Sequence, residues 1–199
     1  LEASETSTDL LVVGGGLTGI WAAAEASAAG RDVIVVEADE LGSGASGRCG
    51  GFINASITHG IPHGHARWPD EMGAIVALQQ RLWDDTLKLL ADHGATDAVV
   101  PCGKLTVAIR PHQVAELAAA VELFHRYGQE AWTLDHDEVR DRVASPTYLG
   151  GYVLASGNGL CDPVRLLQAI AKIAHGAGAA LVQRSRVERL VDDGATVVA

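Results

Sequence analysis

Gly14, Gly16 and Gly19 stand at the spacing G-x-G-x-x-G, and Glu37 follows 18 residues after the last of them. This spacing is typical of a turn that binds the pyrophosphate of a dinucleotide. The first glycine allows the tight turn, the second lets backbone amides approach the phosphates, and the third lets the next helix pack closely on the strand before it. A carboxylate at the position of Glu37 can accept hydrogen bonds from both hydroxyls of an adenosine ribose. It would also repel a 2′-phosphate, so NADP is not expected here.

The elements on both sides of this motif suit it. Residues 10–13 are a continuous apolar run, which predicts a strand buried on both faces. A helix is expected to begin near Leu17, with its free N–H groups facing the phosphates, and to end at Gly30. Residues 33–36 are expected to form the next strand. A glycine turn without a ligand is the alternative, and it is disfavoured because each part of the fingerprint stands in its required context.

The next segment, residues 38–54, is rich in glycine and small side chains. Such a composition is not expected to form a strand or a stable helix. It would let backbone N–H groups face an anion at close range, and Arg48 adds a cation. A flexible linker is the alternative interpretation.

Composition limits the class of protein. The chain has 199 residues, enough for one large domain or two small ones, and its formal net charge of −10 argues against a nucleic-acid partner. Cys49, Cys102 and Cys161 are far apart and form no C-x-x-C motif, which favours reduced thiols and a cytoplasmic location. The apolar stretch 10–24 is interrupted by glycines, so it is not expected to span a membrane.

The middle of the chain contains segments with the helical hydrophobic period of about 3.6 residues and segments with the strand period of two, which predicts an α+β region. Helices are expected over residues 70–93, 111–128 and 135–143, and strands over 104–110, 131–134 and 151–155.

Residues 59–69 contain three histidines, His59, His63 and His65. A metal site is disfavoured because no acidic or thiol partner is close and the spacing fits no compact motif, so a loop is expected. Arg67 and Arg110 could pair with a substrate carboxylate, but surface positions are favoured for both.

The last part of the chain returns to an α/β pattern. Asp162 and Pro163 are expected as the N-cap and first residue of a helix, followed by strands over 180–183 and 186–191. Asp192-Asp193-Gly194 predicts a hairpin turn. Because the chain stops within the second strand of that hairpin, it is expected to be the N-terminal part of a longer protein.

Residues 9–54, which end in G-S-G-A-S-G-R-C-G-G-F-I-N, resemble the D-amino-acid-oxidase superfamily of FAD-dependent oxidoreductases. Within it, the chain is most similar to the γ-glutamylputrescine oxidoreductase-like amine and amino-acid oxidases, in which this loop typically reads G-S-G-A-S-G-R-N-G-G-F. Cys49 therefore replaces an asparagine. Arg48 stands about where some relatives attach the flavin covalently to a histidine, so non-covalent FAD is expected.

The resemblance implies a Rossmann-like FAD-binding domain of the glutathione-reductase type, interrupted by an α+β substrate domain. Residues 1–59 and 156–199 would belong to the FAD-binding domain, with the second segment incomplete, and residues 60–155 to the substrate domain. Val187 matches a position whose backbone packs against adenine, although an ordinary strand valine remains the alternative. The residues implied to hold FAD are Gly14, Gly15, Gly16, Leu17, Thr18, Gly19, Glu37, Ala38, Ala45, Ser46, Arg48, Cys49, Gly50 and Val187.

The resemblance also implies a reaction. The C–N bond of an amine or amino acid would be oxidised by hydride transfer to the flavin, the imine would hydrolyse, and O₂ or another acceptor would reoxidise the flavin. It assigns no catalytic residue and no metal. Two alternatives stay open: an NAD-dependent dehydrogenase, which Glu37 permits but which gives the 42–54 loop no role, and a nucleotide-binding fragment without catalytic activity.

Overall fold

The computed structural model describes residues 6–192 and 197–198. Its backbone contacts divide the chain into two compact units, which are described separately. The first unit contains the residues up to Gly51, Asp92–Ala98 and the residues from Cys161 onward, and the second contains Phe52–Ala91 and Val99–Leu160. The main borders between the units therefore lie at 51 and 161, where the sequence suggested 59 and 156.

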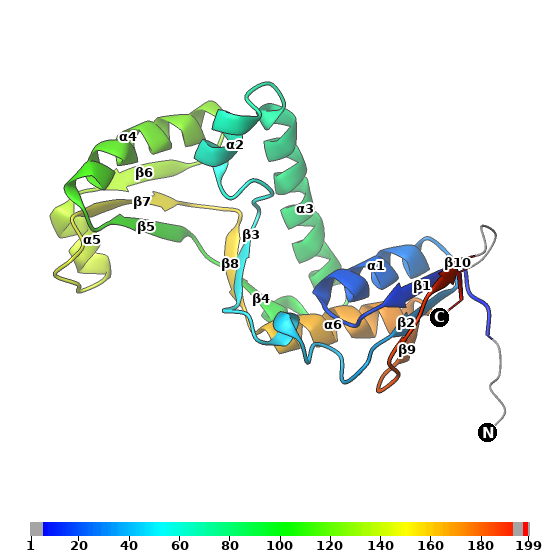
Figure 1. The fold of residues 1–199 in the computed structure, drawn as a ribbon. Helices are drawn as coiled ribbons and strands as arrows, with labels where there is room; N and C mark the ends of the chain where they lie inside the picture. Colours follow the sequence, from blue (N-terminus) through cyan, green and yellow to red (C-terminus); the bar gives the residue numbers. More distant parts are fainter. Residues whose placement is uncertain (1–5, 193–196, 199) are drawn as a thin grey trace. The chain divides into compact units, whose positions relative to one another are not determined.

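The first unit is built on the expected strand, helix and strand: β1 (Leu10–Val13), α1 (Leu17–Ala28) and β2 (Val33–Val36). Strand β2 pairs in parallel with β1 on one side and with β9 (Ala180–Val182) on the other, so the order is β1-β2-β9 (Figure 1). Gly30 follows α1 with a φ of 78°, which confirms the predicted glycine C-cap.

Helix α1 packs on one face of this sheet through small side chains. Ile20, Ala23, Val33 and Val35 are each fully buried at this contact. The prediction that β1 is buried on both faces is wrong, because its end residue Val13 is 53% exposed. Strand β1 lies at the edge of the described sheet, and α1 covers only the face toward which Val33 and Val35 point.

Helix α6 (Pro163–Gly176) lies beside α1 (Figure 1). The Asp162 carboxylate accepts hydrogen bonds from the N–H groups of Val164 and Arg165 at 2.9 and 3.1 Å, so it is the predicted N-cap. The apolar face of α6 is buried through Leu166, Leu167, Ile170, Ile173 and Ala174.

Two further predictions are wrong. Residues 186–190 form no strand; β10 (Val191–Asp192) is the first strand after β9, and it pairs antiparallel with β11 (Val197–Val198). The predicted turn residues Asp193 and Gly194 lie outside the described part of the chain. The glycine loop contains a 3₁₀ turn, η1 (Ala45–Gly47), and leads into β3 (Phe52–Asn54), although no strand was expected there.

The second unit contains two sheets of three strands. One has the order β3-β8-β4, with β8 at Asn158–Cys161 and β4 at Val99–Pro101 after the short turn η2 (Thr96–Ala98). The other has the order β5-β7-β6 and consists of β5 (Lys104–Ala108), β7 (Gly150–Leu154) and β6 (Ala131–Leu134). Strand β3 pairs antiparallel with β8, and β7 pairs antiparallel with β5 and β6. The predicted strands at 104–110, 131–134 and 151–155 are confirmed within one or two residues.

Helices cover both faces of the sheet β5-β7-β6. Tyr152 and Leu154 of β7 pack toward α4 (Pro111–Arg126), whereas Val153 packs against Val139 of α5 (His136–Arg142). This alternation follows from the period of two along a strand. Helix α3 (Met72–Asp92) adds Met72 and Val76 to the core on the α4 side.

The loop expected at residues 59–69 is instead largely a helix, α2 (Ile61–Arg67). Gly60 has a φ of 102°, which turns the chain, and Pro62 lies in the first turn, where it suits a helix. Ile61 is buried in the core with Met72 and Phe124, so tertiary packing holds this short helix in place. Within the described residues, no helix is both long and apolar enough to cross a membrane.

Asp162→Ala is expected to lower the free energy of unfolding by about 1 kcal/mol, because the first N–H groups of α6 lose their acceptor. Asp162→Ser should retain most of the stability, since a serine hydroxyl can accept the same bonds. Urea unfolding followed by circular dichroism measures both variants. Equal losses in the two would contradict the capping role.

Candidate functional site

The turn after β1 depends on glycine at its first and last positions. Gly14 has a φ of 104°, which side-chain-bearing residues rarely adopt, and its N–H donates to the Val36 carbonyl at 2.9 Å. A Cβ atom on Gly19 would collide with the Gly14 carbonyl oxygen and lie 3.0 Å from Val12 Cγ1. The structure therefore confirms the tight turn at Gly14 and the close approach of helix and strand at Gly19.

The middle of the turn is approached by the glycine loop. A Cβ atom on Gly16 would lie 2.9 Å from Ser46 Oγ, and one on Gly15 would collide with the Leu41 side chain. The Gly42 N–H donates to the Gly15 carbonyl at 3.0 Å. The predicted cofactor residues on these two segments are thus brought together.

Ser46 also supplies the acceptor that α1 lacks. The N-cap residue Gly16 has no side chain, and the Leu17 N–H donates to Ser46 Oγ at 3.0 Å. Thr18 and Gly19 complete the first turn, whose N–H groups have no partner inside the helix. The positive end of α1 thus lies at the turn, where an anion is stabilised.

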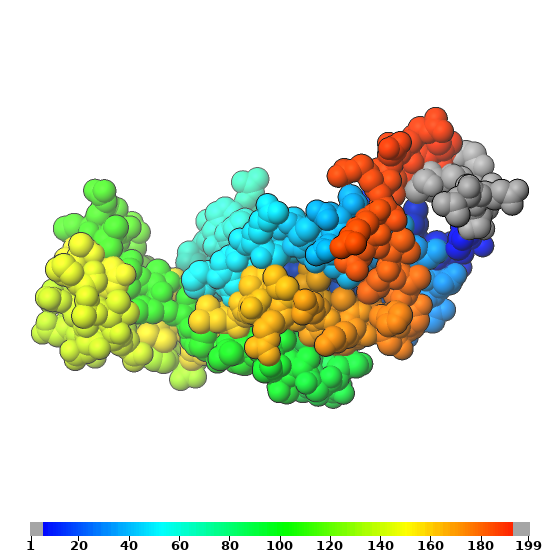
Figure 2. Space-filling view, turned by 90° about the horizontal axis from the view of Figure 1, so that it is seen from below, coloured from blue at the N-terminus to red at the C-terminus, as the bar shows by residue number. Residues whose placement is uncertain are grey.

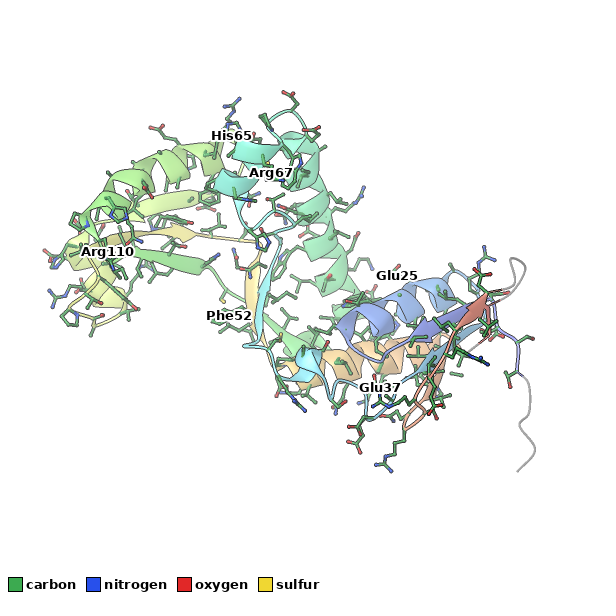
Figure 3. All side chains as sticks on the ribbon, in the orientation of Figure 1. Glu25, Glu37, Phe52, His65, Arg67 and Arg110 are labelled. Atoms are coloured by element: carbon green, nitrogen blue, oxygen red, sulfur yellow. The ribbon has the colours of Figure 1, made fainter. Side chains whose placement is uncertain are left out.

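Glu37 joins the end of β2 to the same turn (Figure 3). Its Oε2 accepts from the Gly15 N–H at 2.7 Å, and its Oε1 accepts from the Asp39 N–H at 2.9 Å. These hydrogen bonds hold the pKa of Glu37 below its ordinary value, and the bond from Gly15 has the largest effect. Burial acts in the opposite direction and is weaker. An ionised carboxylate has about four acceptor positions, so Glu37 can still accept bonds from a ligand.

The glycine loop has a defined conformation, which disfavours the flexible linker. The Gly47 N–H donates to the Gly42 carbonyl at 3.0 Å, and the Arg48 N–H donates to the Ala45 carbonyl at 3.1 Å. A Cβ atom on Gly42 would lie 3.0 Å from Leu167, so the loop packs closely on α6, as Figure 2 shows in light blue and orange. Arg48, Cys49 and Gly50 are exposed at its end.

A segment after β9 also lies beside Glu37, which sequence reasoning missed. The Ser185 N–H donates to the Glu37 carbonyl at 2.9 Å, and Arg184 pairs with Glu40 at 2.7 Å. Gln183 Oε1 accepts from the Leu41 N–H at 2.8 Å. No sequence signal joins residues so far apart. Val187 is half-buried in this segment, outside any strand, and its contact with adenine stays a prediction.

The arginines and histidines of the second unit form no comparable site. Arg67 lies over the Trp68 ring at 5.5 Å, and Arg110 precedes α4, so the two lie on different elements (Figure 3). His65 Nδ1 is 2.7 Å from the Tyr127 hydroxyl. Among the residues that the structure describes, no three His, Cys, Asp or Glu side chains gather as metal ligands.

Comparison with known proteins identifies the family of the chain. Residues 9–199 match the model of the FAD-dependent oxidoreductase (DAO) family. The chain belongs to this family. It is 30% identical to the γ-glutamylputrescine oxidoreductase of Escherichia coli K12 over 184 residues, which cover 84% of this chain and 43% of that protein.

Two further comparisons show the breadth of the family. The chain is 27% identical to a component of the anaerobic glycerol-3-phosphate dehydrogenase of Escherichia coli K12, covering 96% of this chain and 33% of that one. The crystal structure of glycine oxidase from Geobacillus kaustophilus superimposes with a TM-score of 0.77 at 20% identity, covering 96% of this chain and 50% of that one. The chain therefore spans half or less of these relatives, and it has their mixed α/β fold.

The family match decides for FAD over NAD as the cofactor. The residues present fit the ADP part of FAD, because side chains at Gly15, Gly16 and Gly19 would crowd the turn and Glu37 is held ionised with free acceptor positions. The two relatives are named for γ-glutamylputrescine and glycerol 3-phosphate, and the structural neighbour is named for glycine.

Gly19→Ala is expected to lower the free energy of unfolding by about 1–3 kcal/mol, because the new methyl group collides with a backbone carbonyl that cannot move freely. Gly73→Ala is the matched control, since its Cβ would meet nothing within 4 Å in helix α3. Chemical unfolding of both variants measures the difference. Similar stabilities would show that the close packing at Gly19 is not required.

Glu37→Gln is expected to destabilise the protein at pH 7 but much less in acid. Folding lowers the pKa of Glu37, so its ionised form contributes stability above the ordinary glutamate value of 4.5, and this contribution is lost as the pH falls through the lower native pKa. The difference in melting temperature between wild type and Glu37→Gln should therefore shrink below about pH 4.5. A difference that stays constant from pH 7 to pH 3 would contradict this assignment.

Proposed function

We propose that the protein oxidises the C–N bond of a small amine or amino acid, using non-covalently bound FAD. The carbon next to nitrogen loses a hydride to the bound flavin, the nitrogen loses a proton, and the resulting imine is hydrolysed by water. O₂ or another acceptor then reoxidises the flavin. The observation that carries this proposal is the joined arrangement of the Gly14–Gly19 turn, the Ser46 loop and the Glu37 carboxylate.

Each part of this arrangement has a proposed role. Backbone N–H groups of the glycine turn and the first turn of α1 bind the pyrophosphate, and Glu37 with Ala38 binds the ribose. The segment from Ala45 to Gly50, which includes Ser46, Arg48 and Cys49, lies beside the turn and orders the cofactor there. Val187 supports the adenine. Bound FAD supplies the hydride acceptor, and these residues bind and orient it.

The domain assignment is part of the same proposal. The first unit is a Rossmann-like FAD-binding domain, and the second is the first part of an inserted substrate domain. An all-parallel sheet with the glycine turn at the carboxyl end of β1 supports the first assignment. Three free cysteines, Cys49, Cys102 and Cys161, suit a reducing compartment, so we place the protein in the cytoplasm.

Substrate class is chosen from the relatives. γ-Glutamylputrescine oxidoreductase and glycine oxidase are named for nitrogen compounds, which supports an amine or amino acid. The glycerol-3-phosphate dehydrogenase is named for an alcohol, so oxidation of a C–O bond is the second candidate. A fragment that binds nucleotide without turnover is the remaining alternative.

The full-length protein is expected to purify yellow, with an absorbance maximum at about 450 nm, and to release its flavin on acid precipitation. Glu37→Ala should weaken FAD binding at least tenfold, because a charged acceptor for two hydroxyls is lost. Glu25→Ala removes an exposed glutamate from α1 and is the matched control. A colourless protein, or unchanged affinity in Glu37→Ala, would overturn the proposal.

The reaction class is tested by anaerobic bleaching of the flavin. In a panel of primary amines, N-methylated amines and amino acids, some compounds are expected to reduce the flavin and so remove its absorbance at about 450 nm. The rate of this bleaching should be about equal to the turnover rate of the enzyme. Glycerol 3-phosphate should leave the band unchanged. Bleaching by glycerol 3-phosphate alone would favour the second candidate, and bleaching by none would favour the non-catalytic fragment.

A further inference from the structure

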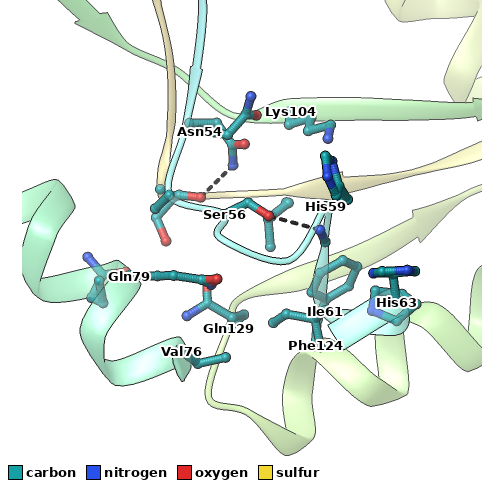
Figure 4. A pocket seen from close by; sticks show the side chains of 18 of the residues that line it. Asn54, Ser56, His59, Ile61, His63, Val76, Gln79, Lys104, Phe124 and Gln129 are labelled. Atoms are coloured by element: carbon teal, nitrogen blue, oxygen red, sulfur yellow. Dashed lines mark hydrogen bonds between the residues drawn. The ribbon is translucent and has the colours of Figure 1, made fainter. Parts of the chain in front are cut away.

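A cavity of about 260 Å³ lies within the second unit, between the 54–60 loop, α2, α3 and β7 (Figure 4). Its apolar lining includes Ile61, Val76 and Phe124. Its polar lining includes Gln79, Lys104 and Asn158 among other residues. The volume suits a molecule of a few non-hydrogen atoms with one polar and one apolar end.

Two buried amides line this cavity with half of their hydrogen-bonding groups unused. Gln79 and Asn158 are each only 6% exposed. Gln79 Oε1 accepts from the Ile57 N–H at 2.8 Å, so its NH₂ group is free to face the cavity. Asn158 Nδ2 donates to the Ser156 carbonyl at 2.7 Å. In both cases the hydrogen bond to the backbone identifies which side-chain amide atom is the oxygen and which is the nitrogen.

The side-chain polar atoms that are fully buried without a hydrogen-bond partner do not include the NH₂ group of Gln79, so solvent or a ligand in the cavity can reach it. Neither of its donors has an acceptor among the described residues. A ligand oxygen in the cavity could satisfy them.

The charge of the lining favours an anion. Lys104 is the first residue of β5, its ammonium has no ion-pair partner within the described chain, and Figure 4 shows it on the same side as His59. None of the described residues that line the cavity is Asp or Glu, although the chain carries a net charge of −10.

The loop that bears His59 is held in an unfavourable backbone conformation. His59 has a φ of 57°, a left-handed conformation that residues other than glycine adopt rarely. The hydroxyl of Ser56 accepts the Gly60 N–H at 2.8 Å, and the Thr58 hydroxyl donates to the Gly60 carbonyl at 3.1 Å. Backbone strain maintained in this way is typical of a binding loop.

We propose that this cavity binds the carboxylate of a small organic acid. Lys104 supplies the positive charge, the Gln79 NH₂ group donates to a carboxylate oxygen, and the apolar lining residues contact a short alkyl chain. The carboxylate belongs either to the substrate of the proposed reaction or to a separate ligand. The binding itself does not depend on the proposed function, and only the assignment to the substrate rests on it.

Calorimetric titration of the full-length protein with butyrate tests the binding. Butyramide is a neutral probe of the same shape, and it should bind at least tenfold more weakly because it lacks the charge that Lys104 recognises. No binding of butyrate up to about 20 mM, or equal binding of the two probes, would overturn the proposal.

Two substitutions assign the binding to this cavity. Lys104→Met should weaken butyrate binding at least tenfold. Gln79→Glu can still accept the Ile57 N–H but turns the donor into an acceptor, so it should abolish binding. Lys172→Met removes an exposed lysine of α6 in the first unit and should bind butyrate as wild type does. If Gln79→Glu fails to fold, Lys104→Met decides alone, and unchanged affinity in Lys104→Met refutes the site.

Inhibition kinetics distinguish the two sources of the carboxylate. With an amine that bleaches the flavin, competitive inhibition by butyrate, lost in Lys104→Met, assigns the cavity to the substrate. Butyrate binding that persists at saturating amine assigns it to a separate ligand. A colourless protein that still binds butyrate refutes the proposed function alone. A yellow, active protein that does not bind butyrate refutes this inference alone.

Discussion

The proposed nucleotide-binding arrangement depends on the hydrogen bonds of the Glu37 carboxylate. One oxygen accepts the Gly15 N–H and the other accepts the Asp39 N–H, so a single side chain connects the turn after β1 with the chain that leaves β2. Both strands are parallel and end at the same edge of the sheet. In open α/β sheets this edge is where ligands bind, because turns and helix N-termini converge there.

Three glycines of the turn serve three different physical needs. Gly14 adopts a backbone conformation that side chains disfavour, Gly16 makes room for Ser46, and Gly19 lets α1 approach β1. The loop that supplies Ser46 is itself held against α6. The proposed site for the ADP part of FAD is therefore built from segments that are distant in sequence but converge on the N-terminus of α1.

The second unit has a different character, because its cavity offers side chains where the first unit offers backbone amides. Gln79 and Asn158 are buried with their amide orientations fixed by backbone partners, and Lys104 brings a positive charge. A site of this kind discriminates by charge and by hydrogen-bond direction, which suits recognition of a small acid. Its residues lie on many different elements and loops, and no local sequence motif marks it.

The sequence by itself determined the elements whose signals are local. The β1, α1 and β2 unit, the Asp162 cap of α6 and the C-terminal turn at Gly30 follow from periodicity, capping residues and glycine, which act over a few neighbours. Only the tertiary structure decided that Phe52–Asn54 is a strand, that Ile61–Arg67 is a helix and that 186–190 is not a strand. Phe52–Asn54 is a strand because β8 pairs with it. Ile61 lies in a helix because its side chain packs into a core that other elements form. Ser185 and Gln183 likewise reach the glycine loop only through folding, since hydrogen bonds between residues more than 140 positions apart leave no periodic trace in the chain.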